Sequence, residues 1–158
     1  MRIETKCIQS GYSPKNGEAR VLPIYQSTTF KYDNCDSMGR LFDLEDSGYF
    51  YTRLGNPTVG CVEAKIADLE GGIGAMMTSS GQAASMMAVL NICSEGDHVL
   101  CSSMVDGGTF NLLGVTLKKY GIEVTFVNPD LPYEEIDKEI KDNTKAIMGE
   151  TISNPALS

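Results

Sequence analysis

The sequence predicts an α/β fold, with an extended N-terminal arm followed by a mainly parallel sheet that has helices on both faces. Two observations support this prediction. From residue 57 to residue 148, segments of helical spacing alternate with short apolar segments of strand type, which is the order that parallel strands joined by helical crossovers produce. Residues 1–56 show no sustained period of either kind. We therefore expect an arm over 1–56 and a sheet-containing domain over 57–158.

The arm contains turn-forming stretches at residues 12–17 and 43–48, where Pro, Asn, Asp, Ser and Gly gather. An aperiodic segment of about fifty residues is uncommon inside a compact domain. The arm is therefore expected to lie across another surface, either the rest of the protein or a neighbouring subunit.

The first periodic element is a helix that begins at Pro57. Asn56 is a suitable N-cap, and proline is favoured in the first helical turn. Apolar residues then keep helical spacing as far as Leu69, and Gly71 and Gly72 follow. These signals predict a helix over about 57–70.

Strand-like and helix-like segments alternate after this helix. Strands are predicted at 75–78, 99–102, 124–127 and 146–148, and helices at about 82–92, 109–120 and 133–141. Ligands of open parallel sheets bind outside the carboxyl ends of the strands. The loops after these strands are therefore the places where functional residues are expected.

Composition excludes several classes of partner. The formal charge of -8 and the lack of clustered Lys and Arg argue against nucleic acid and anionic membranes. The start of the chain does not resemble a signal peptide, and no apolar run is long enough to cross a bilayer. A cytoplasmic location is the resulting expectation.

The cysteines and the histidine offer little chemistry by themselves. Five cysteines without a C-x-x-C pair argue against a disulfide framework and against a zinc ribbon. Cys93 and Cys101 lie in apolar stretches and are expected to be core residues. With His98 as the single histidine, neither a Cys–His dyad nor a metal site is predicted.

The most informative junction is residues 76–84, where a short apolar segment turns through Ser79, Ser80 and Gly81 into an alanine-rich helix. Helix starts of this kind bind phosphate, because unpaired N–H groups and the positive end of the dipole converge there. Ordinary N-capping by either serine is the alternative. A dinucleotide fingerprint is disfavoured because Gly72 and Gly74 precede a strand, and no Walker pattern occurs.

Two further segments carry candidate ligand groups. Tyr51 and Arg53 lie two residues apart, hence on one side of an extended chain, and both side chains can donate to a phosphate; aromatic packing and a surface ion pair are the alternative. Asn154 follows an apolar strand and precedes a proline, which favours an extended conformation at this residue. Asn154 could equally be a turn residue.

Four motifs, in this order, resemble the Cys/Met metabolism family of pyridoxal-phosphate enzymes. They are Tyr-Thr-Arg-Leu-Gly-Asn-Pro-Thr at 51–58, Ser-Ser-Gly-Gln-Ala-Ala at 79–84, Gly-Gly-Thr-Phe-Asn-Leu at 107–112 and Gly-Glu-Thr-Ile-Ser-Asn-Pro at 149–155. The resemblance starts near residue 22 and covers nearly the whole chain. Within the family, the sequence is most similar to O-acetylhomoserine sulfhydrylases, with cystathionine γ-synthase and methionine γ-lyase relatives next.

The resemblance implies the N-terminal part of a fold type I transferase dependent on pyridoxal 5'-phosphate, with residues 57–158 as an incomplete large cofactor-binding domain. It implies a homotetramer built as a dimer of dimers. The implied reaction is γ-replacement on O-acetylhomoserine, an amino-acid substrate, by sulfide or a thiol, which gives homocysteine or methionine.

Site residues also follow from the resemblance. The main-chain N–H groups of Gly81 and Gln82 would bind the cofactor phosphate, and Tyr51 and Arg53 would reach the same phosphate from a neighbouring subunit. Asn154 would donate to the phenolate oxygen of the cofactor. Glu150 would lie nearby in a supporting position.

Two departures from the family pattern affect these expectations. Asp106 stands where relatives have a tyrosine that stacks on the pyridine ring. A carboxylate cannot stack, although it can pair electrostatically with the ring, so either cofactor affinity falls or the site has degenerated. The alternative is that Asp106 simply starts a turn. The Schiff-base lysine is expected beyond residue 158, so residues 1–158 alone are predicted to lack transferase activity. Two alternatives remain: a noncatalytic module that pairs with a full-length relative, and a standalone phosphate or nucleotide binder.

Overall fold

The computed structural model describes residues 1–154 and 157. The chain forms two compact units, Met1–Met77 and Thr78–Ser158. The domains predicted over 1–56 and 57–158 stay a prediction, although within the first unit the helix that follows residue 56 makes its contacts with the arm.

The first unit contains three helices, and two of them correct the expectation of an arm without regular elements. These two are α1 (Ile3–Gln9) and α2 (Cys35–Phe42). Asn34 caps α2, because its Oδ1 accepts the Ser37 N–H at 2.8 Å. Helix α1 is tied to the third helix through an ion pair of 2.7 Å between Lys6 and Asp68. The helices are short, so they present too little periodicity for a sequence pattern to reveal them.

The third helix, α3 (Pro57–Glu70), confirms the predicted element. The Asn56 Oδ1 accepts the Thr58 N–H at 2.9 Å, and Gly71 ends the helix in the left-handed conformation at φ 69°. Asn56 is buried, and its Nδ2 donates to the Tyr25 carbonyl at 3.0 Å. The cap of α3 therefore also holds the arm.

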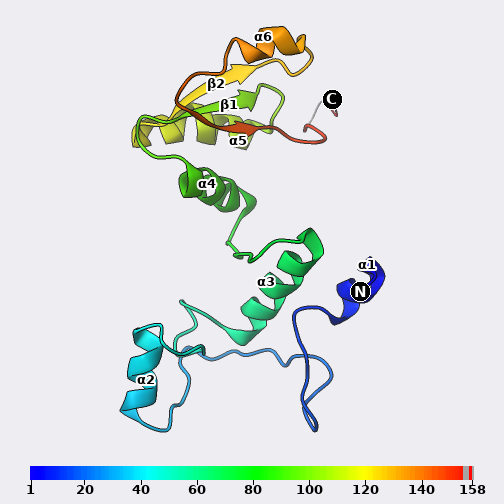
Figure 1. Ribbon diagram of the computed structural model, residues 1–158, viewed down its shortest axis with the longest axis vertical. Helices are drawn as coiled ribbons and strands as arrows, with labels where there is room; N and C mark the ends of the chain where they lie inside the picture. Colours follow the sequence, from blue (N-terminus) through cyan, green and yellow to red (C-terminus); the bar gives the residue numbers. More distant parts are fainter. Residues whose placement is uncertain (155–156, 158) are drawn as a thin grey trace. The chain divides into compact units, whose positions relative to one another are not determined.

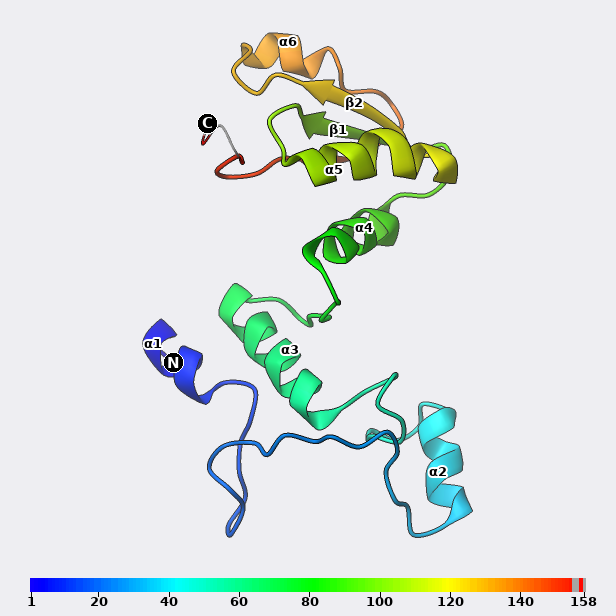
Figure 2. The ribbon, with the colours of Figure 1, turned by 180° about the vertical axis from the view of Figure 1, so that it is seen from behind.

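The N-terminal segment passes very close to α3, as Figures 1 and 2 show for α1 beside that helix. Gly11 has φ +89°, and a Cβ built on it would lie 2.2 Å from the Cys61 carbonyl oxygen. Lys65 Nζ donates to the Cys7 carbonyl at 3.0 Å. Only glycine allows the first approach, because any other side chain would overlap the backbone of α3.

The prediction of a strand at 75–78 was wrong. This segment has no ladder partner in the described part of the chain, and the Met77 N–H is instead donated to the Glu63 Oε1 at 2.8 Å. Met76 and Met77 are exposed. An apolar segment becomes a strand only where another strand completes its hydrogen bonds.

The second unit holds a three-stranded parallel sheet in the order β2-β1-β3, which confirms the predicted α/β class. The strands are β1 (His98–Ser102), β2 (Glu123–Val127) and β3 (Thr144–Met148). Each matches a predicted strand and starts one or two residues earlier. The central strand β1 is paired on both sides, so its residues are the best shielded of the three.

Helices lie on both sides of this sheet, with α6 on the side opposite to α5 in Figures 1 and 2. Helix α4 (Gly81–Ile92) confirms the prediction. The predicted helix at 109–120 is a run of three helical types, and the helix predicted at 133–141 ends earlier. These elements are α5 (Gly107–Asn111), the π-helix η1 (Leu112–Thr116), the 3-10 helix η2 (Leu117–Tyr120) and α6 (Tyr133–Asp137).

The core of the second unit lies between β1 and the helices α4, η1 and η2. Cys93 and Cys101 belong to it, as predicted, together with Val89, Val99, Leu113 and Leu117. Because the core holds α4 against β1, it also sets the position of the first turn of α4 relative to the sheet. Within the described residues, no helix has the length and apolar character needed to cross a membrane.

His98 connects the three strands through its side chain. The ring is fully buried, and Nδ1 and Nε2 lie 2.8 Å and 2.9 Å from the hydroxyls of Thr144 and Thr125. One hydroxyl belongs to β3 and the other to β2. Burial, and then the nearby Lys141, lower the pKa of His98 below its ordinary value of 6.5.

We expect the second unit to lose stability as the pH falls below 6.5, the ordinary pKa of His98. The unfolded chain then binds a proton that the folded one excludes, so the stability is complete above 6.5 and falls as the pH drops from there through the lowered pKa. The loss is at most about 1.4 kcal/mol per pH unit, the limit for one proton. Denaturant unfolding between about pH 5.5 and 7.5 measures it, since His98 is the single histidine. His98→Gln should flatten this dependence; an unchanged slope would contradict the assignment.

Candidate functional site

The start of α4 is an open helix N-terminus. Ser80 is its N-cap, with extended backbone (φ -159°, ψ 157°), and its hydroxyl accepts the Ala83 N–H at 3.1 Å. The preceding turn is closed by Thr78, whose hydroxyl donates to the Ser80 carbonyl at 2.9 Å. The capping role that the sequence offered as an alternative is therefore present, and it uses only one of the first N–H groups.

The N–H groups of Gly81 and Gln82 remain available. Both residues are exposed, and no acceptor for either N–H occurs among residues 1–154 and 157. A Cβ built on Gly81 would meet no atom within 4 Å. The helix has twelve residues without a charged side chain, so no carboxylate of its own competes for its positive end. Such a terminus suits an anion with several oxygens, such as a phosphate.

The side chain of Gln82 turns away from these donors toward the second helix of the unit. Its Nε2 donates to the Thr109 hydroxyl at 3.2 Å and lies 3.5 Å from the Asp106 Oδ2. Asp106 is the N-cap of α5, where its Oδ2 also accepts the Gly108 N–H at 2.9 Å and the Thr109 N–H at 3.3 Å. The sequence alternative in which Asp106 starts a turn therefore describes its position well.

Glu150 connects this cluster to the end of β3. Its Oε1 accepts the Asp106 N–H at 3.0 Å, and the supporting position near the cofactor expected for Glu150 stays a prediction. Asn154 is exposed in a turn four residues later. The proline expected to hold Asn154 extended, Pro155, lies outside the described residues.

Tyr51 and Arg53 belong to the first unit and line one cavity there, of about 720 Å³. Tyr51 forms an isolated antiparallel bridge with Thr29, and a turn follows. The Arg53 Cζ lies 5.2 Å from the centre of the Tyr51 ring, a cation–π contact. The two side chains therefore come together in a turn rather than in an extended chain, and their role toward a phosphate stays a prediction.

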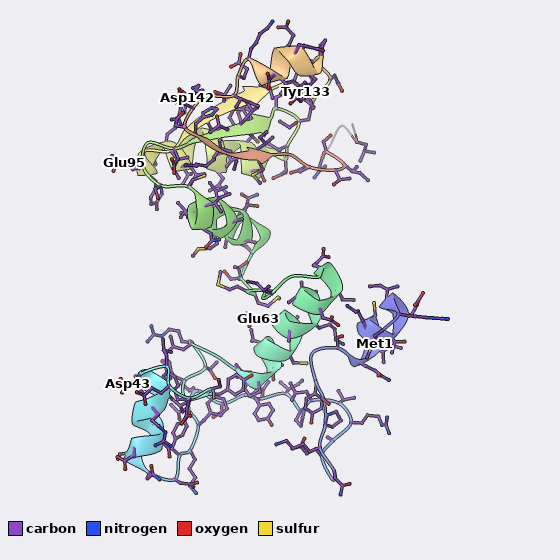
Figure 3. All side chains as sticks on the ribbon, in the orientation of Figure 1. Met1, Asp43, Glu63, Glu95, Tyr133 and Asp142 are labelled. Carbon is purple, nitrogen blue, oxygen red and sulfur yellow. The ribbon has the colours of Figure 1, made fainter. Side chains whose placement is uncertain are left out.

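Glu63 lines the same cavity and was not found by sequence analysis. It lies on α3 (Figure 3), and its carboxylate holds the Met77 N–H at 2.8 Å. Met77 directly precedes the segment that leads to α4. No motif marks Glu63, because its partner is a main-chain group fourteen residues away.

The buried Cys101 thiol is a poor nucleophile. Burial, and then the nearby Glu150 carboxylate, raise the pKa of the Cys101 thiol to about 11, so it stays protonated at neutral pH. Over residues 1–154 and 157, no group of three or more His, Cys, Asp or Glu side chains could hold a metal ion.

The family model and the most similar relatives that were compared agree on the family. Residues 4–158 match the family described as Cys/Met metabolism PLP-dependent enzyme. The chain is 48% identical over 155 residues to the O-acetyl-L-homoserine sulfhydrylase of Corynebacterium glutamicum, with 97% of this chain and 35% of that protein covered. It is 42% identical over 153 residues to the L-methionine gamma-lyase of Treponema denticola, with 97% and 38% covered.

A solved structure shows the same fold. A putative O-acetylhomoserine (thiol)-lyase from Campylobacter jejuni, which contains N'-pyridoxyl-lysine-5'-monophosphate, superposes with a TM-score of 0.90 at 35% identity. The match covers 100% of this chain and 39% of that one. The chain thus spans little more than a third of the length of the relatives that it matches.

Proposed function

The chain belongs to the Cys/Met metabolism family of PLP-dependent enzymes, and from this membership we propose that residues 1–158 bind the phosphate of pyridoxal 5'-phosphate in an enzyme of the O-acetylhomoserine sulfhydrylase type. The proposed reaction replaces the γ-substituent of O-acetylhomoserine by sulfide or a thiol. The observation that carries the proposal is the start of α4, where the N–H groups of Gly81 and Gln82 are exposed and lack acceptors among the described residues.

The donor set fits the phosphate end of this cofactor. Two adjacent N–H groups and the helix dipole favour a dianion, and the open space beside Gly81 lets phosphate oxygens approach the main chain. We propose that Asn154 donates to the ring oxygen and that Glu150 holds the end of β3 through the Asp106 N–H. When bound, the cofactor supplies the electron sink, and the protein supplies binding and orientation.

Tyr51 and Arg53 are proposed to complete the phosphate site from a neighbouring subunit, in a homotetramer built from dimers. Their contact within one cavity supports this assignment, since a single anion could accept from both the phenol and the guanidinium. We also propose a cytoplasmic location. The five cysteines are free thiols, the state that a reducing compartment maintains.

None of the lysines of residues 1–158 lies in a segment that resembles the family's lysine motif. We therefore propose that residues 1–158 supply the phosphate contacts and not the amine of the Schiff base, so that these residues by themselves bind the cofactor without a covalent bond. Activity is proposed for their combination with a segment that corresponds to the remaining length of the relatives, which contains the required amine.

Binding measurements on the full chain test the proposal. We expect pyridoxal phosphate to bind more tightly than pyridoxal, by about tenfold or more, because charge-assisted hydrogen bonds to the phosphate are lost in pyridoxal. Inorganic phosphate should compete. Borohydride treatment followed by mass spectrometry should find no single lysine modified stoichiometrically. Equal affinity for the two vitamers would refute the phosphate site.

Methionine γ-lyase activity is the second candidate, favoured by 42% identity to the Treponema denticola enzyme. A further candidate is a noncatalytic module that pairs with a full-length relative. Product analysis of the complemented enzyme separates the first two, because only a lyase releases a thiol from methionine. A stoichiometric complex with a full-length relative, without any gain of activity, would favour the module.

A further inference from the structure

The carboxylate of Asp106 accepts several hydrogen bonds, and its place in the sequence does not predict them. Three N–H groups reach the same oxygen, Oδ2, at 2.9 Å from Gly108, 3.3 Å from Thr109 and 3.5 Å from the Gln82 side chain. The Gln82 amide also donates to the buried Thr109 hydroxyl at 3.2 Å. The carboxylate is thus used to join the first turn of α4 to the first turn of α5.

The main chain of Asp106 is held as well. Its N–H donates to Glu150 beyond the end of β3 at 3.0 Å. One residue therefore links three segments: the start of α4 with its two free donors, the start of α5, and the loop that continues from Glu150 to Asn154.

The packing around this carboxylate is close. A Cβ built on Gly108 would lie 2.9 Å from the Asp106 Oδ2 and 3.0 Å from the Gln82 Nε2. The first distance is shorter than real Cβ atoms show, and the second is tighter than most of them. A larger residue at position 108 would therefore have to displace the ends of the Asp106 and Gln82 side chains from this arrangement.

We propose that Asp106 is a positioning residue for the phosphate site: the Asp106 acceptor oxygen holds the Gln82 side chain against α5 and so keeps the Gln82 N–H directed outward. The inference rests on the proposed function. It assigns the carboxylate to the protein rather than to the cofactor ring. The oxygen as acceptor is what matters, and the negative charge is dispensable, or even unfavourable next to a phosphate.

The alternative is an electrostatic contact between the carboxylate and the pyridine ring of the cofactor. The two readings make opposite predictions for Asp106→Asn. Asparagine keeps an acceptor oxygen for the three N–H groups but removes the charge. Under the positioning role it should behave like the natural residue, whereas under the ring contact it should behave like Asp106→Ala.

The experiment measures dissociation constants of pyridoxal phosphate and pyridoxal for the full chain and for Asp106→Asn, Asp106→Ala and Gln82→Ala. The ratio of the two constants isolates the phosphate. We expect Asp106→Ala and Gln82→Ala to reduce this phosphate preference by about fivefold, the effect of one hydrogen bond. Asp106→Asn should keep it within about twofold. A purely structural role would weaken both ligands equally and leave the ratio unchanged.

Each outcome decides the matter. If the natural chain shows no phosphate preference, the proposed function fails and the inference fails with it. If that preference exists but Asp106→Asn loses it as fully as Asp106→Ala does, the charge matters and the positioning role is refuted. Should Asp106→Ala not fold, the exposed Gln82 provides the test, since an unchanged preference in Gln82→Ala would also refute the role. Changes in the amide NMR shifts of Gly81 and Gln82 on addition of inorganic phosphate give a second readout. We expect Asp106→Asn to show these changes.

Discussion

Replacement of Gly81 by proline is expected to weaken binding of pyridoxal phosphate by about ten- to a hundredfold while α4 stays folded. Proline is favoured at the first position of a helix, and the extended backbone of Ser80 is the conformation that a following proline requires. No atom lies within 4 Å of an added Cβ. The substitution therefore removes one N–H without a clash inside the protein, although its ring also takes some of the space beside the main chain. A hydrogen bond from that N–H to a phosphate contributes about 1.5–3 kcal/mol, which corresponds to the expected loss.

Gly81→Ala is the matched control, because alanine keeps the N–H and is a better helix former than glycine. Titration of the full chain with pyridoxal phosphate should place this variant between the natural chain and Gly81→Pro. Pyridoxal, which lacks the phosphate, should bind all three with similar affinity. A proline variant that retains full preference for the phosphorylated form would show that the phosphate is held elsewhere, and thermal unfolding confirms that the comparison involves folded chains.

The parts of the fold that sequence predicted are those set by local signals. Helix α3 was recognisable because its cap, its first proline and its final glycine all lie next to the residues that they organise. The start of α4 was recognisable for the same reason: Ser80 and Gly81 are adjacent, and the conformation of a helix terminus depends on neighbours in the chain. The three strands were recognisable as apolar segments between helices.

The parts that sequence missed depend on distant partners. Residues 75–78 have the composition of a strand, but the Met77 N–H is held by Glu63 of α3 instead of a neighbouring strand. Helix α1 is too short to be stable alone and is held by contacts with α3, among them the ion pair between Lys6 and Asp68. No spacing rule connects residues that lie about sixty positions apart, so only the folded chain reveals such contacts.

The candidate site also has a part that local signals predict and a part that depends on distant partners. Motifs identified Gly81 and Gln82, and the main-chain geometry that makes them donors follows from their place in a helix. The role of Asp106 could not be read from its sequence context, because its partners Gln82 and Glu150 lie 24 and 44 residues away. An aspartate near the proposed phosphate site looks unfavourable until its carboxylate is seen to accept hydrogen bonds from donors of the protein.

The second large effect concerns the arm: two variants that each bind pyridoxal phosphate poorly should restore tight sites when their chains are mixed. Arg53→Ala removes the guanidinium next to Tyr51 and should weaken phosphate binding by about tenfold or more, as expected for charge-assisted contacts. Gly81→Pro damages the other half of the site. If each site combines α4 of one chain with the arm of its neighbour, a mixed dimer contains one intact site and one doubly damaged site.

Stoichiometry distinguishes this arrangement from a site formed within one chain. Random pairing of equal amounts should restore tight binding at about a quarter of all sites, because half of the dimers are mixed and each mixed dimer has one intact site of two. A site contained in one chain would recover nothing, since every chain carries one lesion. Arg53→Lys keeps the charge but loses the planar fork, so it should show an intermediate affinity when assayed alone. If the mixed chains show no more tight binding sites than either variant alone, Arg53 does not belong to a site shared between chains. This conclusion holds whatever the affinity of the natural protein for the cofactor.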